Sequence, residues 1–202
     1  MDWTINLDQG IVSNKQIDLH SLMYEKRNDI GDIVYLFPAD SINLRHKQIK
    51  HATVIRPHFA LCGYMKNFVN DSIVIFGRTE VEFLNELDID TRYHRIEALS
   101  NFQIPCVFFT NYGEYEINPK LIDIFLGKDI PVFGFKNKTP VLLFRLMDIL
   151  DDVFCPKTMV HGSLVEVFSV GILIIGDSGI GKSELTMELV GRGHLFVADD
   201  IV

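Results

Sequence analysis

The segment from Gly176 to Ser183 combines glycines, a lysine and a hydroxyl residue at a spacing that suits phosphate binding. It reads Gly176, Asp177, Ser178, Gly179, Ile180, Gly181, Lys182, Ser183, which fits the P-loop pattern of a glycine, four free residues and Gly-Lys-Ser. Glycines let the backbone turn tightly and point its N–H groups at a polyphosphate, and a following helix adds partial positive charge. Lys182 would then contact the β- and γ-phosphates of a nucleotide, and the Ser183 hydroxyl would bind Mg²⁺.

The residues on either side of this segment predict the strand and the helix that a P-loop requires. Residues 171–175 are a glycine followed by four apolar residues, which is typical of a strand buried on both faces. Behind the loop, residues 183–190 carry Leu185, Leu189 and Val190 at helical spacing, and Gly191 is a natural end for that helix. We therefore favour a nucleotide-binding loop over a glycine-rich turn without a ligand.

Two neighbouring carboxylates, Asp199 and Asp200, stand at the end of a mostly apolar strand that starts near His194. This is the layout of a Walker B element, whose carboxylates hold Mg²⁺ or take a proton from an attacking hydroxyl. Adjacent residues on a strand face opposite ways, so both can reach one site only where the strand ends. We expect one of them to act mainly as a base and the other to serve the metal or the structure.

His161 is the third candidate, and it depends on the topology expected upstream of the loop. Residues 163–168 and 171–175 read as two strands joined by a short turn, which predicts an antiparallel hairpin leading into the P-loop. Such a hairpin places the start of its first strand, near His161, beside the end of its second strand. A histidine there could touch phosphate or orient a substrate group. The spacing alone is equally compatible with a structural His161 that caps a backbone group or packs in the core.

Composition and charge narrow the classes of function. The 202 residues carry a formal net charge of −8, which argues against a sequence-independent nucleic-acid binder because such proteins need a basic face. The N-terminus lacks a basic and then apolar leader, and no run approaches the length of a membrane span, so we expect a soluble, unexported protein without a membrane partner. The three cysteines lack metal-ligand spacing and are expected to be reduced, partly buried thiols in the cytoplasm. The seven histidines show no zinc spacing, so Mg²⁺ is the only metal expected.

The first three quarters of the chain read as an α/β domain. Strands are predicted at residues 33–37, 72–76, 104–109 and 130–135, and helices at 79–87, 119–126 and 139–150. The alternation predicts a mostly parallel sheet covered by helices, a three-layer α/β domain over residues 1–153. Thr79 and Glu82 have the spacing of a capping box at the start of the first of these helices. A break near residues 151–158 would separate this domain from a second one over residues 154–202.

Several charged residues of the first domain lie near predicted strand ends, where ligands can bind in such folds. They include Arg56, His58, Arg78 and Glu80, and we favour salt bridges or helix caps over ligand contacts for them. The polar and basic residues 43–50 are interpreted as a solvated face rather than a binding patch.

Three segments together resemble the HPr kinase/phosphorylase family, bacterial serine kinases that act on the phosphocarrier protein HPr. They are residues 160–162, the P-loop with Glu184, and residues 192–200. The hairpin between them is also similar, although Ser169 stands where the family has a glycine in the turn. In the first domain the similarity is looser and rests on Arg56-Pro57 and residues 76–80.

This resemblance implies a P-loop kinase domain similar to phosphoenolpyruvate carboxykinase, truncated here at residue 202. It implies Mg²⁺- and ATP-dependent phosphorylation of a serine on HPr and the reverse phosphorolysis of phosphoserine by inorganic phosphate, which yields pyrophosphate. Family members are typically cytoplasmic homohexamers that tie carbon-source use to glycolytic intermediates. Carried over by residue, Lys182 binds phosphate, Ser183 binds Mg²⁺, and His161 belongs to the catalytic group. Asp200 is the preferred base for the substrate serine, with Asp199 as its neighbour.

The family continues past the position of Val202 with a metal-binding acidic residue, a catalytic arginine and a signature segment for the reverse reaction. We therefore expect the 202-residue chain alone to have little or no activity. Two other functions remain compatible with the sequence. One is a nucleotide-sensing module that binds ATP without transferring phosphate, and the other is a small-molecule kinase on the same scaffold.

Overall fold

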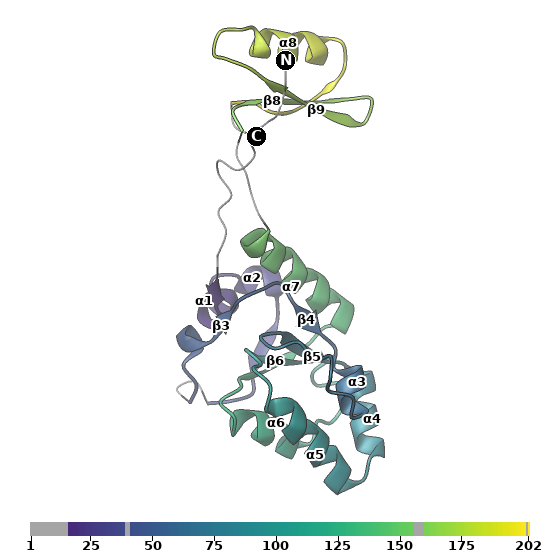
Figure 1. Cartoon of the computed structure of the whole chain (residues 1–202). Coiled ribbons are helices and arrows are strands. Elements are labelled where there is room, and N and C mark those ends of the chain that lie inside the picture. The colour runs from purple at the N-terminus through teal and green to yellow at the C-terminus, as the bar shows by residue number, and fades with distance from the viewer. Residues whose placement is uncertain (1–15, 39–40, 156–159, 201) are drawn as a thin grey trace. The chain divides into compact units, whose positions relative to one another are not determined.

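The computed structural model describes residues 16–38, 41–155, 160–200 and 202, and the chain divides into two compact units at Cys155 and Pro156 (Figure 1). The boundary predicted at residues 153 and 154 falls in the last turn of a helix, and part of the predicted break at 151–158 lies outside the described residues. The N-terminal unit contains β1 (Ile17–Asp18), α1 (Leu19–Tyr24), α2 (Arg27–Ile30), β2 (Ile33–Tyr35), the 3₁₀ turn η1 (Leu44–His46), β3 (Gln48–Ile49), β4 (Val54–Ile55), α3 (His58–Leu61), β5 (Ile73–Phe76), α4 (Arg78–Glu86), α5 (Ile89–Ser100), β6 (Val107–Thr110), α6 (Pro119–Leu126), β7 (Val132–Phe135) and α7 (Thr139–Phe154). The C-terminal unit contains β8 (Gly162–Val167), β9 (Val170–Ile175), α8 (Lys182–Gly191) and β10 (Leu195–Ala198).

The N-terminal unit is built on a five-stranded sheet of order β2-β7-β6-β5-β4. Strands β4 to β7 run parallel, as the alternation of strands and helices predicts, and β2 adds an antiparallel edge. Every residue of β5, β6 and β7 is buried. Continuous apolar runs suit such strands because both faces of a parallel sheet are covered.

Two apolar clusters cover the two faces of this sheet, which gives three layers (Figure 1). One packs α1 and α7 against side chains that include Phe108 and Phe133, whose rings stack at 5.2 Å between centroids. The other packs α4, α5 and α6 against side chains that include Phe76 and Phe109, stacked at 5.0 Å. Alternate residues of one strand therefore serve opposite layers.

A buried carboxylate, Glu80, organises the carboxyl ends of β4 and β5. Arg56 donates to it from Nε at 2.9 Å and from Nη2 at 3.0 Å, and His58 Nε2 lies 2.5 Å from Glu80 Oε1. The backbone N–H of Gly77 also donates to Glu80 Oε2 at 2.8 Å. The interpretation of these charged residues as ion pairs and caps is therefore confirmed.

The predicted capping box at Thr79 and Glu82 is wrong. Helix α4 begins at Arg78 with Gly77 as its N-cap, and Glu80 is the residue that reaches back to the cap N–H. Glu82 instead accepts a hydrogen bond from Arg78 at 2.6 Å on the helix surface. The cause is a tertiary contact, because Arg56, the residue after β4, holds the Glu80 carboxylate where it can cap the helix.

The structure contains one long helix that the sequence pattern missed. Helix α5 has few buried residues along its length, so its apolar stripe is narrow, and it is capped by Asp88, which accepts from Thr91 N at 2.9 Å. Helix α6 has the predicted bounds, and α7 continues to Phe154, beyond the predicted end. In the described part of the chain, no helix is long and apolar enough to cross a bilayer.

The exposure of the three cysteines differs from the partial burial that the sequence analysis predicts. Cys106 is fully buried, which raises the pKa of its thiol, whereas Cys62 and Cys155 are exposed. All three are free thiols.

The C-terminal unit is a three-stranded antiparallel sheet of order β10-β8-β9 with α8 packed on it. The predicted hairpin is confirmed, since β8 pairs with β9 from Gly162↔Ile175 to Val167↔Val170. The prediction that residues 171–175 are buried on both faces is wrong. Side chains of β9 are exposed, including Ile172 at 40% and Ile175 at 44%. A sheet of three strands with one described helix has too few elements to cover both faces.

The hairpin turn gives a first stability prediction. Phe168 and Ser169 have φ values of 51° and 64°, the left-handed region that glycine adopts without steric cost. We expect Ser169→Gly to stabilise the C-terminal unit by about 1 kcal/mol. Hydrogen exchange of the β8 and β9 amides should slow accordingly. Ser169→Ala is the matched control, because it keeps the strained φ, and equal protection in both variants would contradict the explanation.

Candidate nucleotide-binding site

The glycine-rich loop, residues 176–181, connects β9 to α8 and has the backbone geometry that its glycines permit. Gly179 and Gly181 have φ values of 81° and 100°, so both need a residue without a Cβ atom. Helix α8 begins at Lys182, and its N-cap Gly181 provides no side-chain hydrogen bond. The first N–H groups of α8 therefore remain free of a cap at the loop, an arrangement that can bind an anion.

Lys182 lies over the loop from the first turn of α8. Its Nζ donates to the carbonyl oxygens of Gly176 at 2.8 Å and Asp177 at 2.9 Å. An ammonium group has three N–H donors, so one remains for a phosphate oxygen. The lysine is thus held above the loop by the chain's own backbone.

A cavity of about 590 Å³ collects nearly all of the predicted site residues. It is lined by His161, Gly162, Gly176, Asp177, Ser178, Gly179, Gly181, Lys182, Ser183, Glu184, Asp199 and Asp200. Ile180, predicted as part of the loop, does not line the cavity, and its side chain is 67% exposed. The loop, the start of β8 and the end of β10 thus converge on one space.

The two aspartates differ in their surroundings although both line the cavity. Neighbouring side chains on a strand point to opposite faces, but strand β10 ends at Ala198, so this alternation does not extend to Asp199 and Asp200. Asp199 accepts a hydrogen bond from the hydroxyl of Ser163 on β8. Asp200 has a φ of 68°, and among the described residues its carboxylate has no hydrogen-bond or ion-pair partner. One carboxylate is anchored and the other is open to the cavity.

His161 is held by the same segment that carries the aspartates. Its Nδ1 lies 3.1 Å from the backbone oxygen of Asp200. A carbonyl oxygen only accepts, so Nδ1 carries the proton and, in the neutral ring, Nε2 keeps its lone pair. The predicted neighbourhood of His161 and the loop is therefore present, with Nε2 as the nitrogen left for a ligand or a proton.

Ser163 is a site residue that the sequence analysis missed. It sits in a strand that also carries Glu166, so a hydroxyl there is not distinctive. Its burial and its hydrogen-bond partner are visible only in the structure, so the sequence offered no usable signal for it.

The charge of the cavity favours a divalent cation with any polyphosphate. Among the described residues, four carboxylates line it, from Asp177, Glu184, Asp199 and Asp200, against the single ammonium of Lys182. The described residues contain no group of three or more His, Cys, Asp or Glu placed to hold a metal by themselves. Mg²⁺ commonly binds through one or two carboxylates together with substrate phosphates, and the Ser183 hydroxyl and the aspartates are the hard oxygen donors it prefers. The donor set therefore fits Mg²⁺ that arrives with a nucleotide.

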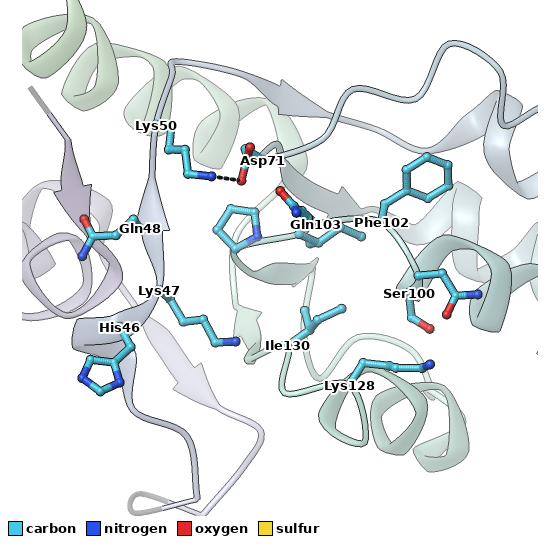
Figure 2. Close-up of a pocket in the computed structure, with 13 residues that line it drawn as sticks. His46, Lys47, Gln48, Lys50, Asp71, Ser100, Phe102, Gln103, Lys128 and Ile130 are labelled. Atoms are coloured by element: carbon cyan, nitrogen blue, oxygen red, sulfur yellow. Dashed lines mark hydrogen bonds and ion pairs between the residues drawn. The ribbon is translucent and has the colours of Figure 1, made fainter. Parts of the chain in front are cut away.

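A second cavity, of about 550 Å³, lies at the amino edge of the parallel sheet and has a basic lining (Figure 2). Two of its three lysines have structural partners: Lys47 forms an ion pair with Asp129, and Lys50 Nζ lies 3.0 Å from Asp71 Oδ1. Helices α5 and α6 both end at this edge, and the carbonyls at helix C-termini attract cations. The two ion pairs support the interpretation of residues 43–50 as a solvated face rather than a binding patch.

Comparison with known proteins places the chain in a family. Residues 32–150 match the family described as HPr Serine kinase N terminus, and residues 152–202 match the HPr Serine kinase C-terminal domain. An HPr kinase/phosphorylase from Prosthecochloris aestuarii is 35% identical over 198 residues, which cover 98% of this chain and 57% of the relative. One from Chlorobium phaeovibrioides is 36% identical over 198 residues, which cover 98% of this chain and 58% of the relative.

Among solved structures, the CBS and DRTGG domains of the regulatory region of Clostridium perfringens pyrophosphatase, complexed with diadenosine tetraphosphate, match with a TM-score of 0.44. The match has 14% identity and covers 69% of this chain and 51% of that one, a likeness too weak to define the fold. The chain spans less than three fifths of the two curated relatives described above. With its N-terminal family matched over more than half of its residues, the chain belongs to the HPr kinase/phosphorylase family.

Proposed function

We propose that this chain carries the nucleotide-binding part of a bifunctional kinase and phosphorylase that acts on a serine of HPr. The observation that supports it most is the cavity in which Lys182 and Ser183 face His161 and the aspartate pair. Family membership supports ATP as the phosphoryl donor and HPr as the protein substrate. A fold similar to phosphoenolpyruvate carboxykinase for the C-terminal unit, a homohexamer and a cytoplasmic location belong to the same proposal.

In the kinase direction, an aspartate of the pair takes the proton of the substrate serine hydroxyl, and the serine oxygen attacks the γ-phosphorus of ATP. The bond from that phosphorus to the β–γ bridging oxygen breaks, and ADP leaves. Lys182 binds the phosphate oxygens, where negative charge gathers. Mg²⁺, when bound through Ser183 and the nucleotide, supplies charge neutralisation between the phosphates.

In the reverse direction, an oxygen of inorganic phosphate attacks the phosphorus of phosphoserine. The serine oxygen leaves and takes the proton back from the same aspartate, and the products are serine and pyrophosphate. One carboxyl group therefore serves as base in one direction and as acid in the other. His161, with Nε2 available, is placed to orient a phosphate oxygen or the attacking group.

Substituting each aspartate in turn shows which of the two is the catalytic base. Asp200 is our preferred base because its carboxylate has no partner among the described residues, whereas Asp199 is hydrogen-bonded to Ser163. We expect Asp200→Asn to lower both transfer reactions by about a thousandfold, within the range attributed to general acid–base groups. Phosphate transfer to and from HPr is the measurement. Both activities surviving in Asp200→Asn and failing in Asp199→Asn would reverse the assignment.

The whole proposal is tested with labelled ATP and HPr. A form of the protein that continues to the full length of its relatives is expected to label a serine of HPr and to release pyrophosphate when phosphoserine-HPr and phosphate are supplied. The 202-residue chain is expected to transfer little. Efficient labelling by the 202-residue chain would contradict that second expectation. Nucleotide binding without transfer by the longer form would favour a nucleotide sensor, and labelling of a metabolite instead of HPr would favour a small-molecule kinase.

A further inference from the structure

Three consecutive residues at the start of β8 hold the segment that carries the aspartate pair. His161 Nδ1 and the backbone N–H of Gly162 both approach the backbone oxygen of Asp200, at 3.1 Å and 3.4 Å. The hydroxyl of the next residue, Ser163, donates to Oδ1 of Asp199. The first two contacts fix the backbone, and the third is the one that reaches a carboxylate.

We propose that Ser163 is a positioning residue, whose buried hydroxyl orients the Asp199 carboxylate for Mg²⁺-ATP binding. The proposal rests on the proposed function, because it takes the cavity of residues 161–200 to be a nucleotide site. Ser163 does not line that cavity and touches no ligand position itself. Its effect on binding is therefore expected to pass through Asp199.

The burial of Ser163 explains why its hydroxyl is directed at Asp199. The residue is fully buried between apolar neighbours on β8 and pairs with Ile174 on β9. A buried hydroxyl without a partner costs free energy, and the Asp199 oxygen is the acceptor that satisfies it. The side chain of Ser163 thus has one favourable arrangement, and that arrangement sets the carboxylate.

The consequence for Asp199 is a loss of freedom. Ser163 uses Oδ1 of Asp199, which leaves Oδ2 free of that contact in a residue that lines the cavity. A carboxylate that is ordered before binding loses less conformational entropy when Mg²⁺-ATP arrives. Removal of the hydroxyl should therefore weaken binding.

The test is a double-mutant cycle on Mg²⁺-ATP binding, measured by titration calorimetry on the 202-residue chain. We expect Ser163→Ala to weaken binding by about fivefold, the loss of a fraction of one charge-assisted hydrogen bond. In an Asp199→Ala background the same substitution should have no further effect. Ser163→Thr keeps a hydroxyl on a β-strand and should restore at least half of the lost affinity.

Several outcomes would overturn the proposal. An equal loss of affinity in both backgrounds would show that Ser163 acts through the fold and not through Asp199. No loss of affinity in either background would show that Ser163 has no part in Mg²⁺-ATP binding. If the unaltered chain binds no Mg²⁺-ATP, the proposed function fails, and the position of Asp199 is then followed by its carboxyl ¹³C chemical shift. That signal should move in Ser163→Ala and stay in Ser163→Thr if Ser163 holds the carboxylate. An unmoved signal in both variants would refute the positioning role.

Discussion

Replacing Lys182 with alanine is expected to weaken Mg²⁺-ATP binding by roughly thirtyfold or more, about 2 kcal/mol, because it removes the one ammonium that the described residues place among the four carboxylates of the cavity. Lys182 is held over the loop by two carbonyl oxygens at 2.8 and 2.9 Å, so its charge is already in place before a ligand binds. Without it, no cationic side chain of the described lining residues would face the phosphates of the nucleotide, and the metal would have to offset the four carboxylates. Titration calorimetry with Mg²⁺-ATP measures the loss directly.

A control substitution at the other end of the same helix distinguishes the effect of the Lys182 charge in the cavity from the effect of the protein's net charge. Arg192 lies at the other end of α8, where its guanidinium pairs with Glu188 at 2.7 Å on the surface. Arg192→Ala changes the net charge by the same amount as Lys182→Ala but leaves the cavity intact. It should alter affinity by less than about twofold, because exposed charges are screened by salt. A similar loss of affinity in both variants would show that Lys182 acts only through the net charge of the protein.

Replacing Arg56 with methionine is expected to destabilise the N-terminal unit by about 3–5 kcal/mol, the cost of leaving a buried charge without its partner. The side chain of Glu80 is fully buried, and Arg56 provides two of its hydrogen bonds. His58 and the Gly77 N–H would be the contacts left to it. Adding Glu80→Gln to Arg56→Met should recover part of the loss, since the uncompensated charge is then gone.

The unfolding of this unit can be followed separately from the rest of the chain. All six tyrosines lie between residues 24 and 115, so near-UV circular dichroism in the tyrosine band during thermal unfolding reports mainly on the N-terminal unit. Arg78→Met is the matched control, because Arg78 pairs with Glu82 through side chains that are more than half exposed. It should change stability by less than about 0.5 kcal/mol. Equal effects of the two substitutions would contradict the special role given to the buried pair.

Features encoded by local spacing could be predicted from the sequence. The hairpin of residues 163–175 follows from two apolar runs around a short turn, and helix α6 begins at its proline as predicted. The gathering of Lys182, His161 and the aspartates around one cavity follows from the hairpin and from the end of β10, which together leave few other positions for them. The parallel sheet follows in the same way from strands that alternate with helices.

Features that depend on distant partners could not be predicted. The capping residue of α4 is Glu80 because Arg56, 24 positions away, holds its carboxylate. Helix α5 was missed because its stability comes from packing one narrow stripe and not from a strong local pattern. Ser163 gained its partner from a residue 36 positions further along the chain. The exposure of β9 contradicts its sequence pattern, since an apolar run shows what a strand can bury but not which elements are present to cover it.

Strand β9, which leads into the glycine-rich loop, is paired on one side only among the described residues, with β8. The end of the loop that follows β9 is therefore held by one ladder of backbone hydrogen bonds, and opening of that ladder would move this end away from the aspartates. A ligand that binds only the closed form would stabilise it by about 2.7 kcal/mol at a concentration one hundred times its dissociation constant. Nucleotide binding and closure of the β8–β9 hairpin are thus coupled, because the ligand shifts the equilibrium between the open and closed forms. Saturating Mg²⁺-ATP should therefore slow hydrogen exchange along β9 as well as at the loop.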